Sequence, residues 1–202
     1  MNHLPVTDAD LDPRRAAILG AAFGCFCQYG FRRTAMEDIA RAAGLSRAAL
    51  YLHFANKQDI YRSLLHNYYA QTDARIRAAL QPAMAPEAAL SAVFAAKAGP
   101  ELEAMFDSPH GEELLDANFR AGADIVQEGE AQIAAILANW LQREADAGRI
   151  ALPDEPEELA QTMIAALSGI KSPGAGIDAF RAGAARLATL MGRGLRAEAA
   201  RA

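Results

Sequence analysis

The sequence is poor in cysteine and in aromatic residues, and both shortages limit the kinds of protein it can encode. Its 202 residues include two cysteines and one tryptophan, and aromatic residues make up 7%. Cys25 and Cys27 are two positions apart in a segment with helical periodicity, where such residues do not face each other. We therefore expect reduced thiols. The low aromatic content, together with 48 alanines, favours helices over strands and predicts an all-α protein.

Long apolar runs, targeting signals and catalytic motifs are also missing. No run of 18 apolar residues occurs, and no basic segment followed by an apolar one begins the chain, so we expect a soluble, cytoplasmic protein. No nucleophile elbow, P-loop or dinucleotide fingerprint is present, and catalysis is not indicated. His110 and Glu113 are three positions apart, but two ligands are too few for a metal site, so no metal or cofactor is expected.

Positive charge is scarce over the whole chain, yet it is concentrated in one part. The formal net charge is -5, but residues 13–65 hold eight basic and three acidic residues, a net charge of +5. Residues 66–202 carry -7, and three aspartates in the first twelve residues add -3. Such an asymmetry suggests an anion-binding module joined to a module with another task. We therefore expect two domains, residues 13–65 and residues 66–202.

Capping residues, glycines and prolines divide the chain into nine or ten expected helices. Asp12 and Pro13 begin the first helix, which runs to Gly30, and Thr34 with Glu37 fits a capping box for the second. Gly44 ends that helix, and Ser46 caps the third. The expected ranges from the third helix onward are 47–53, 56–80, 86–97, 101–107, 110–147 with a break near 122–129, 156–170 and 177–197.

The two short helices on either side of Gly44 form a helix-turn-helix pattern, whose second helix is sized for the DNA major groove. Ile39, Leu50 and Phe54 are expected to form the shared core, which leaves other residues of the second helix facing outward. The outward residues expected to face bases are Arg47, Ala48, Tyr51 and Leu52. The side chains with donors suited to phosphate oxygens are Ser46, Tyr51, His53 and Lys57.

Residues 34–57 resemble the DNA-binding signature of the TetR family of transcriptional regulators. The resemblance is carried by Asp38-Ile39-Ala40, Ala43-Gly44, Ser46, Leu50-Tyr51, His53-Phe54 and Lys57, and it extends over about residues 13–65. It implies a dimeric, all-helical repressor that binds double-stranded DNA and leaves it when a small ligand binds the C-terminal domain. It also implies base contacts from Arg47, Ala48 and Tyr51, phosphate contacts from Ser46, His53 and Lys57, and capping or backbone contact by Thr34.

The C-terminal part offers weaker patterns for a ligand pocket and a dimer interface. The pocket candidates are Phe94, Met105, Phe106, His110, Asn118, Phe119 and Trp140, although such residues also form ordinary cores. The last two helices carry apolar stripes that could pair with a second chain in a four-helix bundle. These stripes include Leu159, Met163, Ile170, Ile177, Phe180, Ala184, Leu187 and Met191. The alternative is that both stripes face this chain's own core.

The sequence thus predicts a ligand-responsive DNA-binding regulator, most simply a repressor, acting as a homodimer on a pseudo-palindromic operator. An activator of the same family would have the same sequence features. A different alternative is a helical protein that binds a small molecule and carries a non-functional DNA-binding motif. Neither the effector nor the regulated genes follow from the residues.

Overall fold

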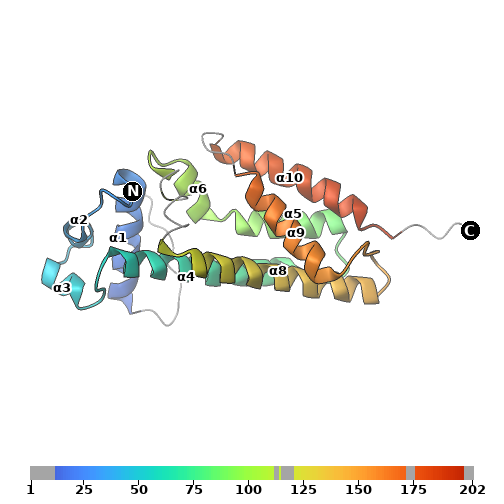
Figure 1. Cartoon of the computed structure of the whole chain (residues 1–202), viewed down its shortest axis with the longest axis horizontal. Coiled ribbons are helices and arrows are strands. Elements are labelled where there is room, and N and C mark those ends of the chain that lie inside the picture. Colours follow the sequence, from blue (N-terminus) through green and yellow to red (C-terminus); the bar gives the residue numbers. More distant parts are fainter. Residues whose placement is uncertain (1–11, 112–113, 115–120, 172–175, 198–202) are drawn as a thin grey trace, which may run out of the picture. The chain divides into compact units, whose positions relative to one another are not determined.

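The computed structural model describes residues 12–111, 114, 121–171 and 176–197, and this part of the chain contains nine α-helices and no strand (Figure 1). The one extended pairing there is an isolated antiparallel bridge between Ile150 and Arg196. The all-α prediction is confirmed. The helices are α1 (Pro13–Tyr29), α2 (Met36–Ala42), α3 (Arg47–Tyr51), α4 (Lys57–Ala79), α5 (Pro86–Lys97), α6 (Pro100–Phe106), α8 (Ala123–Asp146), α9 (Pro156–Gly169) and α10 (Gly176–Gly194).

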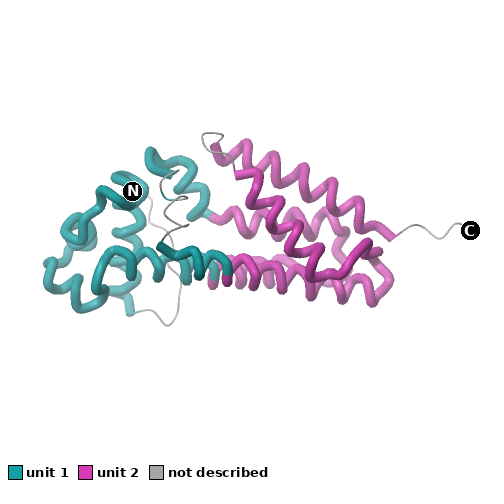
Figure 2. Tube along the Cα trace, in the orientation of Figure 1, with its two compact units in different colours: residues 1–69, 100–127 teal, residues 70–99, 128–202 magenta. Residues whose placement is uncertain are grey.

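The chain divides into two compact units, coloured separately in Figure 2. Unit 1 comprises residues 1–69 and 100–127, and unit 2 comprises residues 70–99 and 128–202. Helices α4 and α8 each contribute residues to both units. Unit 1 therefore includes α6 and the start of α8 in addition to the basic segment. The functional division into residues 13–65 and 66–202 stays a prediction.

The helix boundaries follow the caps that the sequence contains. The Asp12 carboxylate accepts a hydrogen bond from the Arg14 amide at 3.1 Å, and Pro13 follows it as the first helical residue. Pro86 and Pro156 likewise begin α5 and α9. The sequence predicts a break in the helical segment near residues 122–129. The break lies at the start of that interval, because α8 begins at Ala123 and continues through Gly129 to Asp146.

Unit 1 has an aromatic core beneath its short helices. Phe26 is fully buried, and its ring centroid lies 5.2 Å from Phe31 and 6.1 Å from Tyr61. The Tyr61 hydroxyl donates to the Leu114 carbonyl oxygen at 3.3 Å, and burial raises the pKa of this phenol. The predicted core stripe of α1 is confirmed in full, since Ile18, Leu19, Ala22, Cys25 and Phe26 are its buried residues.

Unit 2 is built around the contact between α5 and α10. Gly192 of α10 lies so close to α5 that a Cβ at this position would be 2.6 Å from the Glu87 Cα. Trp140 of α8 is fully buried, and its indole N–H donates to the Gln81 carbonyl oxygen at 3.3 Å. The buried positions of α10 are Ile177, Phe180, Ala184, Ala188 and Gly192.

This packing corrects half of the predicted dimer face. Met163, Ile177, Phe180 and Ala184 are at most 8% exposed within a single chain, so their side chains pack in its own core. The reason is that an apolar stripe at helical spacing looks the same whichever neighbour covers it. Leu159, Ile170, Leu187 and Met191 are half-buried, and their contact with a second chain stays a prediction.

None of the helices in the described ranges is long and apolar enough to cross a membrane.

Candidate nucleic-acid interface

Helices α2 and α3 are joined by a turn that Gly44 makes sterically allowed. Gly44 has a φ of 69°, in the left-handed region that glycine adopts without cost. The Gly44 amide donates to the Arg41 carbonyl at 3.2 Å, and the Leu45 amide donates to the Ala40 carbonyl at 2.8 Å. This pair of bonds is a Schellman motif, which ends α2 and turns the chain sharply into α3.

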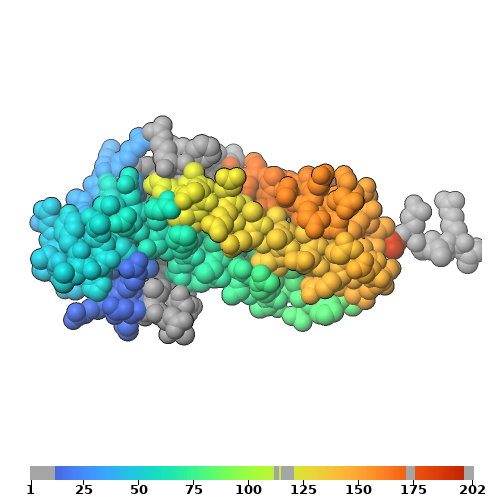
Figure 3. Space-filling model, turned by 60° about the horizontal axis from the view of Figure 1, so that its bottom comes forward, coloured from blue at the N-terminus to red at the C-terminus, as the bar shows by residue number. Residues whose placement is uncertain are grey.

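Helix α3 is short, capped and outward-facing. The Ser46 hydroxyl oxygen accepts from the Ala49 amide at 3.1 Å, which confirms the predicted cap. Leu50 is fully buried and Phe54 is 3% exposed, so the predicted shared core with Ile39 is also confirmed. The helix ends at Tyr51, two residues before the predicted end at His53. It lies at the surface in the space-filling view (Figure 3, cyan).

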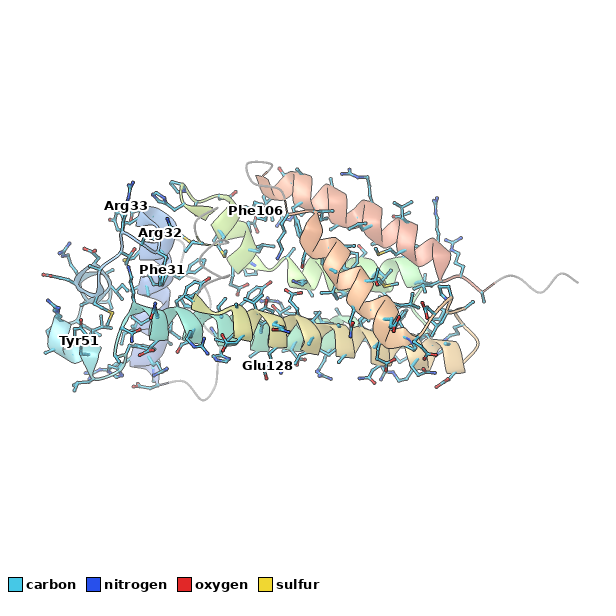
Figure 4. All side chains as sticks on the ribbon, viewed as in Figure 1. Phe31, Arg32, Arg33, Tyr51, Phe106 and Glu128 are labelled. Carbon is cyan, nitrogen blue, oxygen red and sulfur yellow. The ribbon has the colours of Figure 1, made fainter. Side chains whose placement is uncertain are left out.

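The residues predicted to face bases are all solvent-exposed. Arg47 and Ala48 are exposed, Tyr51 is 42% exposed, and Leu52 is 86% exposed. The Arg47 guanidinium carbon lies 5.6 Å from the Tyr51 ring centroid, so the two side chains are stacked on one face of α3. Figure 4 shows Tyr51 on this helix. A planar cation held on an aromatic ring at the surface is suited to bidentate recognition of a base edge.

Thr34 has a different place from the one predicted. Thr34 is 2% exposed, and its hydroxyl donates to the Gly30 carbonyl at 2.7 Å. The Cys25 carbonyl is a second, longer acceptor for the same hydroxyl at 3.3 Å. The capping box with Glu37 is therefore wrong. Helix α2 begins at Met36, and the Asp38 carboxylate accepts from the Ala35 amide at 3.0 Å instead. Because the Thr34 side chain is turned inward, its hydroxyl is not presented to a phosphate.

Lys57 also departs from its predicted role as a phosphate contact. Its ammonium donates to the carbonyl oxygens of Phe31, Arg32 and Thr34 at 2.7, 3.0 and 2.9 Å. An ammonium has three N–H donors, and these three bonds use them all. Lys57 therefore ties the start of α4 to the loop before α2, and Figure 4 shows Phe31 and Arg32 on that loop.

Arg15 is a residue whose role the sequence did not reveal. Its guanidinium donates to the His53 carbonyl at 3.3 Å and to the Ser63 hydroxyl at 3.1 Å. The same group lies 4.2 Å from the Phe54 ring centroid. Arg15 thus fixes the end of α3 to α1 and α4. Its partners are 38 and 48 positions away, so no local pattern could have identified it.

Unit 1 carries other basic side chains that are exposed to solvent. Arg14, Arg32, Arg33 and Arg41 are exposed, and Arg41 makes only a surface ion pair of 3.7 Å with Asp38. Such a pair contributes little to stability and is easily exchanged for a phosphate. Part of the positive charge counted along the sequence therefore lies at the surface of unit 1.

The predicted ligand residues do not form one group. Phe94 and Trp140 are fully buried in unit 2, whereas Met105, Phe106 and His110 are half-buried in unit 1. Asn118 and Phe119 lie outside the described residues, as does Glu113. A surface hollow of about 410 Å³ in unit 1 involves His110, and its other lining residues are Gln28, Tyr29, Arg33 and Asp38.

The described residues also provide no metal site or reactive thiol. They contain no group of three His, Cys, Asp or Glu side chains placed to hold a metal ion. Cys25 and Cys27 are free, and burial raises the pKa of the Cys27 thiol to about 11. A thiol with this pKa is protonated at neutral pH and is therefore a poor nucleophile.

Comparisons with known proteins agree with this geometry. Residues 18–64 match the family model described as bacterial regulatory proteins, tetR family. The HTH-type transcriptional regulator RutR of Escherichia coli K12 is 29% identical over 154 residues, which cover 72% of this chain and 68% of RutR. The regulator TtgR of Pseudomonas putida is 38% identical over 72 residues, covering 36% of this chain and 34% of TtgR.

A solved structure with the same fold is that of SmeT, the repressor of a multidrug efflux pump in Stenotrophomonas maltophilia. It matches with a TM-score of 0.69 at 18% identity and covers 91% of each chain. SmeT has also been solved in complex with triclosan. At this identity the match concerns the fold.

Proposed function

Because the chain belongs to the tetR family of bacterial regulatory proteins, we propose that it is a repressor that binds operator DNA as a dimer and leaves it when a small molecule binds. The observation that carries the proposal is the exposed face of α3, where Arg47 and Tyr51 stack beside Ala48 on a helix fixed from below by Leu50. The response to a small molecule is supported by the triclosan complex of SmeT.

In this proposal the side chains of α3 divide into base readers and phosphate contacts. Arg47 makes a bidentate contact with a guanine, Ala48 packs on a thymine methyl group, and Tyr51 reaches an adjacent base edge. Ser46 and His53, at the two ends of the helix, contact phosphates and set its register. Thr34 and Lys57 act from within, by holding the loop before α2 in place.

Two copies of α3 in a dimer would read two half-sites of a pseudo-palindromic operator, about one helical turn or a multiple apart. The half-buried residues Leu159, Ile170, Leu187 and Met191 are the remaining candidates for the contact between the copies. Binding of the effector and of DNA must then oppose each other reciprocally, since each favours a different state of the same protein.

The test is fluorescence anisotropy with DNA from the promoter region of the protein's own gene. We expect Arg47→Ala to weaken specific binding by about 5- to 150-fold, the range for one lost bidentate base contact. Arg143→Ala, which removes an exposed arginine of α8 in unit 2, is the matched control and should leave binding unchanged. If the wild-type protein shows no salt-sensitive binding, or if Arg47→Ala and Tyr51→Ala change nothing, the non-functional motif is the correct alternative.

A further inference from the structure

Helix α3 ends in an exposed leucine to which the proposed function gives no role. Leu52 follows Tyr51 directly and is 86% exposed, the highest value among the exposed large apolar side chains of the described residues. Its side chain therefore adds almost nothing to the core of unit 1. Single exposed leucines are common at protein surfaces, so the position of Leu52 on α3 decides what it can do.

The backbone of Leu52 is fixed although its side chain is exposed. Leu52 keeps helical angles, with a φ of -70° and a ψ of -23°, and its amide donates to the Ala49 carbonyl at 3.3 Å. The chain is anchored before and after it, because Leu50 is fully buried and the Arg15 guanidinium donates to the His53 carbonyl at 3.3 Å. The fold thus presents the Leu52 side chain to solvent from a preorganised base, which lowers the entropic cost of a contact there.

The outer surface of α3 consists of two neighbouring rows of side chains. Residues four positions apart lie one above the other on the same face of a helix. Arg47 and Tyr51 form the first row, in which the guanidinium carbon lies 5.6 Å from the ring centroid. Ala48 and Leu52 form the second row, and both are exposed. Because the side chains of the second row have no hydrogen-bonding group, α3 presents an apolar row beside a polar one.

The major groove of DNA offers one apolar group that suits such a row, the C5-methyl group of thymine. From Ala48 to Leu52 the helix rises about 6 Å, at about 1.5 Å per residue, and successive base pairs are about 3.4 Å apart. The apolar row therefore spans about two base-pair steps. The edges of guanine and adenine, and the amino group of cytosine, present donors and acceptors that a leucine would leave without partners.

We propose that Leu52 is a specificity-determining residue that packs on the methyl group of a thymine, about two base pairs from the thymine that Ala48 contacts. This inference rests on the proposed function, in which α3 reads bases. Each half-site then contains two thymines at this spacing, beside the guanine that Arg47 contacts. Leu52 selects against cytosine at its position, because cytosine lacks the methyl group. Contact of Leu52 with the sugar-phosphate backbone is the alternative, and it would not distinguish thymine from uracil.

The test begins with selection of binding sequences from a pool of random DNA duplexes by the full chain, which requires no known operator. Each thymine of the selected duplex is then replaced in turn by deoxyuridine, which removes only the methyl group. We expect replacement at two positions of a half-site, about two base pairs apart, to weaken binding by about fourfold each, the effect of one buried methyl group. Fluorescence anisotropy measures the affinities.

Two variants assign one of these positions to Leu52. Leu52→Ala should bind the thymine duplex about fourfold more weakly than the wild type and should no longer distinguish thymine from uracil at that position. The discrimination at the position assigned to Ala48 should remain. Leu52→Met is the matched control, because it keeps an apolar side chain of similar volume and should retain the preference for thymine. Both variants should unfold at the wild-type temperature, since the Leu52 side chain is exposed.

The outcomes separate this inference from the proposed function. The inference is overturned if no deoxyuridine replacement weakens binding of the wild type. It is also overturned if Leu52→Ala weakens binding to the thymine and uracil duplexes equally, which would place Leu52 on the backbone, or if it weakens neither. In these cases the selected duplex still binds and the proposed function stands. If the selection enriches no sequence at all, the proposed function fails, and this inference fails with it.

Discussion

The two units use their buried and half-buried lysines in opposite ways. In unit 1, the Lys57 ammonium donates three hydrogen bonds to backbone carbonyls and thereby holds the loop before α2 in place. In unit 2, the Lys97 ammonium lies 2.6 Å from the Glu130 carboxylate, and burial together with the charge of Lys97 lowers the pKa of Lys171 to about 8. The first arrangement stabilises a fixed surface for DNA. The second pairs charged side chains of two helices inside unit 2.

The largest effect should come from breaking the ion pair of unit 2 on one side. Lys97→Met leaves the largely buried Glu130 carboxylate, which is 25% exposed, without its lysine, and we expect a loss of about 3 kcal/mol in the free energy of unfolding. Urea denaturation followed by circular dichroism measures it. The double variant Lys97→Met with Glu130→Met should recover most of this loss. A single variant as stable as the wild type would show that Lys97 contributes no buried charge.

Much of this difference between the units could not be predicted from the sequence, because the contacts join residues that are far apart along the chain. The caps at Asp12 and Ser46 and the turn at Gly44 involve residues at most five positions apart, so sequence patterns predicted them. Lys57 reaches carbonyls 23 to 26 positions away, and Lys97 pairs across 33 positions. Local patterns assigned Lys57 to a phosphate and gave Lys97 no role, because the partners are set by packing alone.

The second prediction concerns pH and Lys171. Between pH 8 and the ordinary lysine pKa of 10.5, the folded chain releases the proton of Lys171 while the unfolded chain keeps it. The unfolded state then binds more protons, so stability rises with pH across this window. Below pH 8 both states are protonated, and the cost of the buried charge is constant. Thermal unfolding at several pH values should show this rise in the wild type relative to Lys171→Met, and parallel curves for the two proteins would contradict it.

The third prediction distinguishes the structural role of Lys57 from the phosphate contact that its sequence position suggested. Lys57→Met removes hydrogen bonds from a charged donor, and we expect a loss of about 1.5–3 kcal/mol in stability. Because no phosphate contact is lost, the slope of log affinity against log salt concentration for DNA binding should stay unchanged. Anisotropy at several salt concentrations measures the slope. A slope that is smaller by about one, which corresponds to one fewer released counterion, would instead show that Lys57 contacts a phosphate.

The smallest effects come from a pair of glycines that end helices in the two units with the same geometry. Gly44 after α2 has a φ of 69°, and Gly148 after α8 has a φ of 68°. The Gly148 amide donates to the Ala145 carbonyl at 2.8 Å, and the Arg149 amide donates to the Glu144 carbonyl at 2.9 Å. The Schellman motif of unit 1 is therefore repeated in unit 2. No atom lies within 4 Å of a Cβ built at either glycine.

Alanine at either position is therefore strained only through its backbone, and each variant should lose about 1–2 kcal/mol of stability. Gly24→Ala in α1, where the helix leaves open space, should instead gain about 0.5–1 kcal/mol and serves as the control. Measurement of DNA affinity distinguishes the two variants, because Gly44 sets the turn into α3 whereas Gly148 lies in unit 2. We expect Gly44→Ala alone to weaken DNA binding, and equal weakening by Gly148→Ala would mean that the helix end in unit 2 controls the reading face as strongly as the turn beside it.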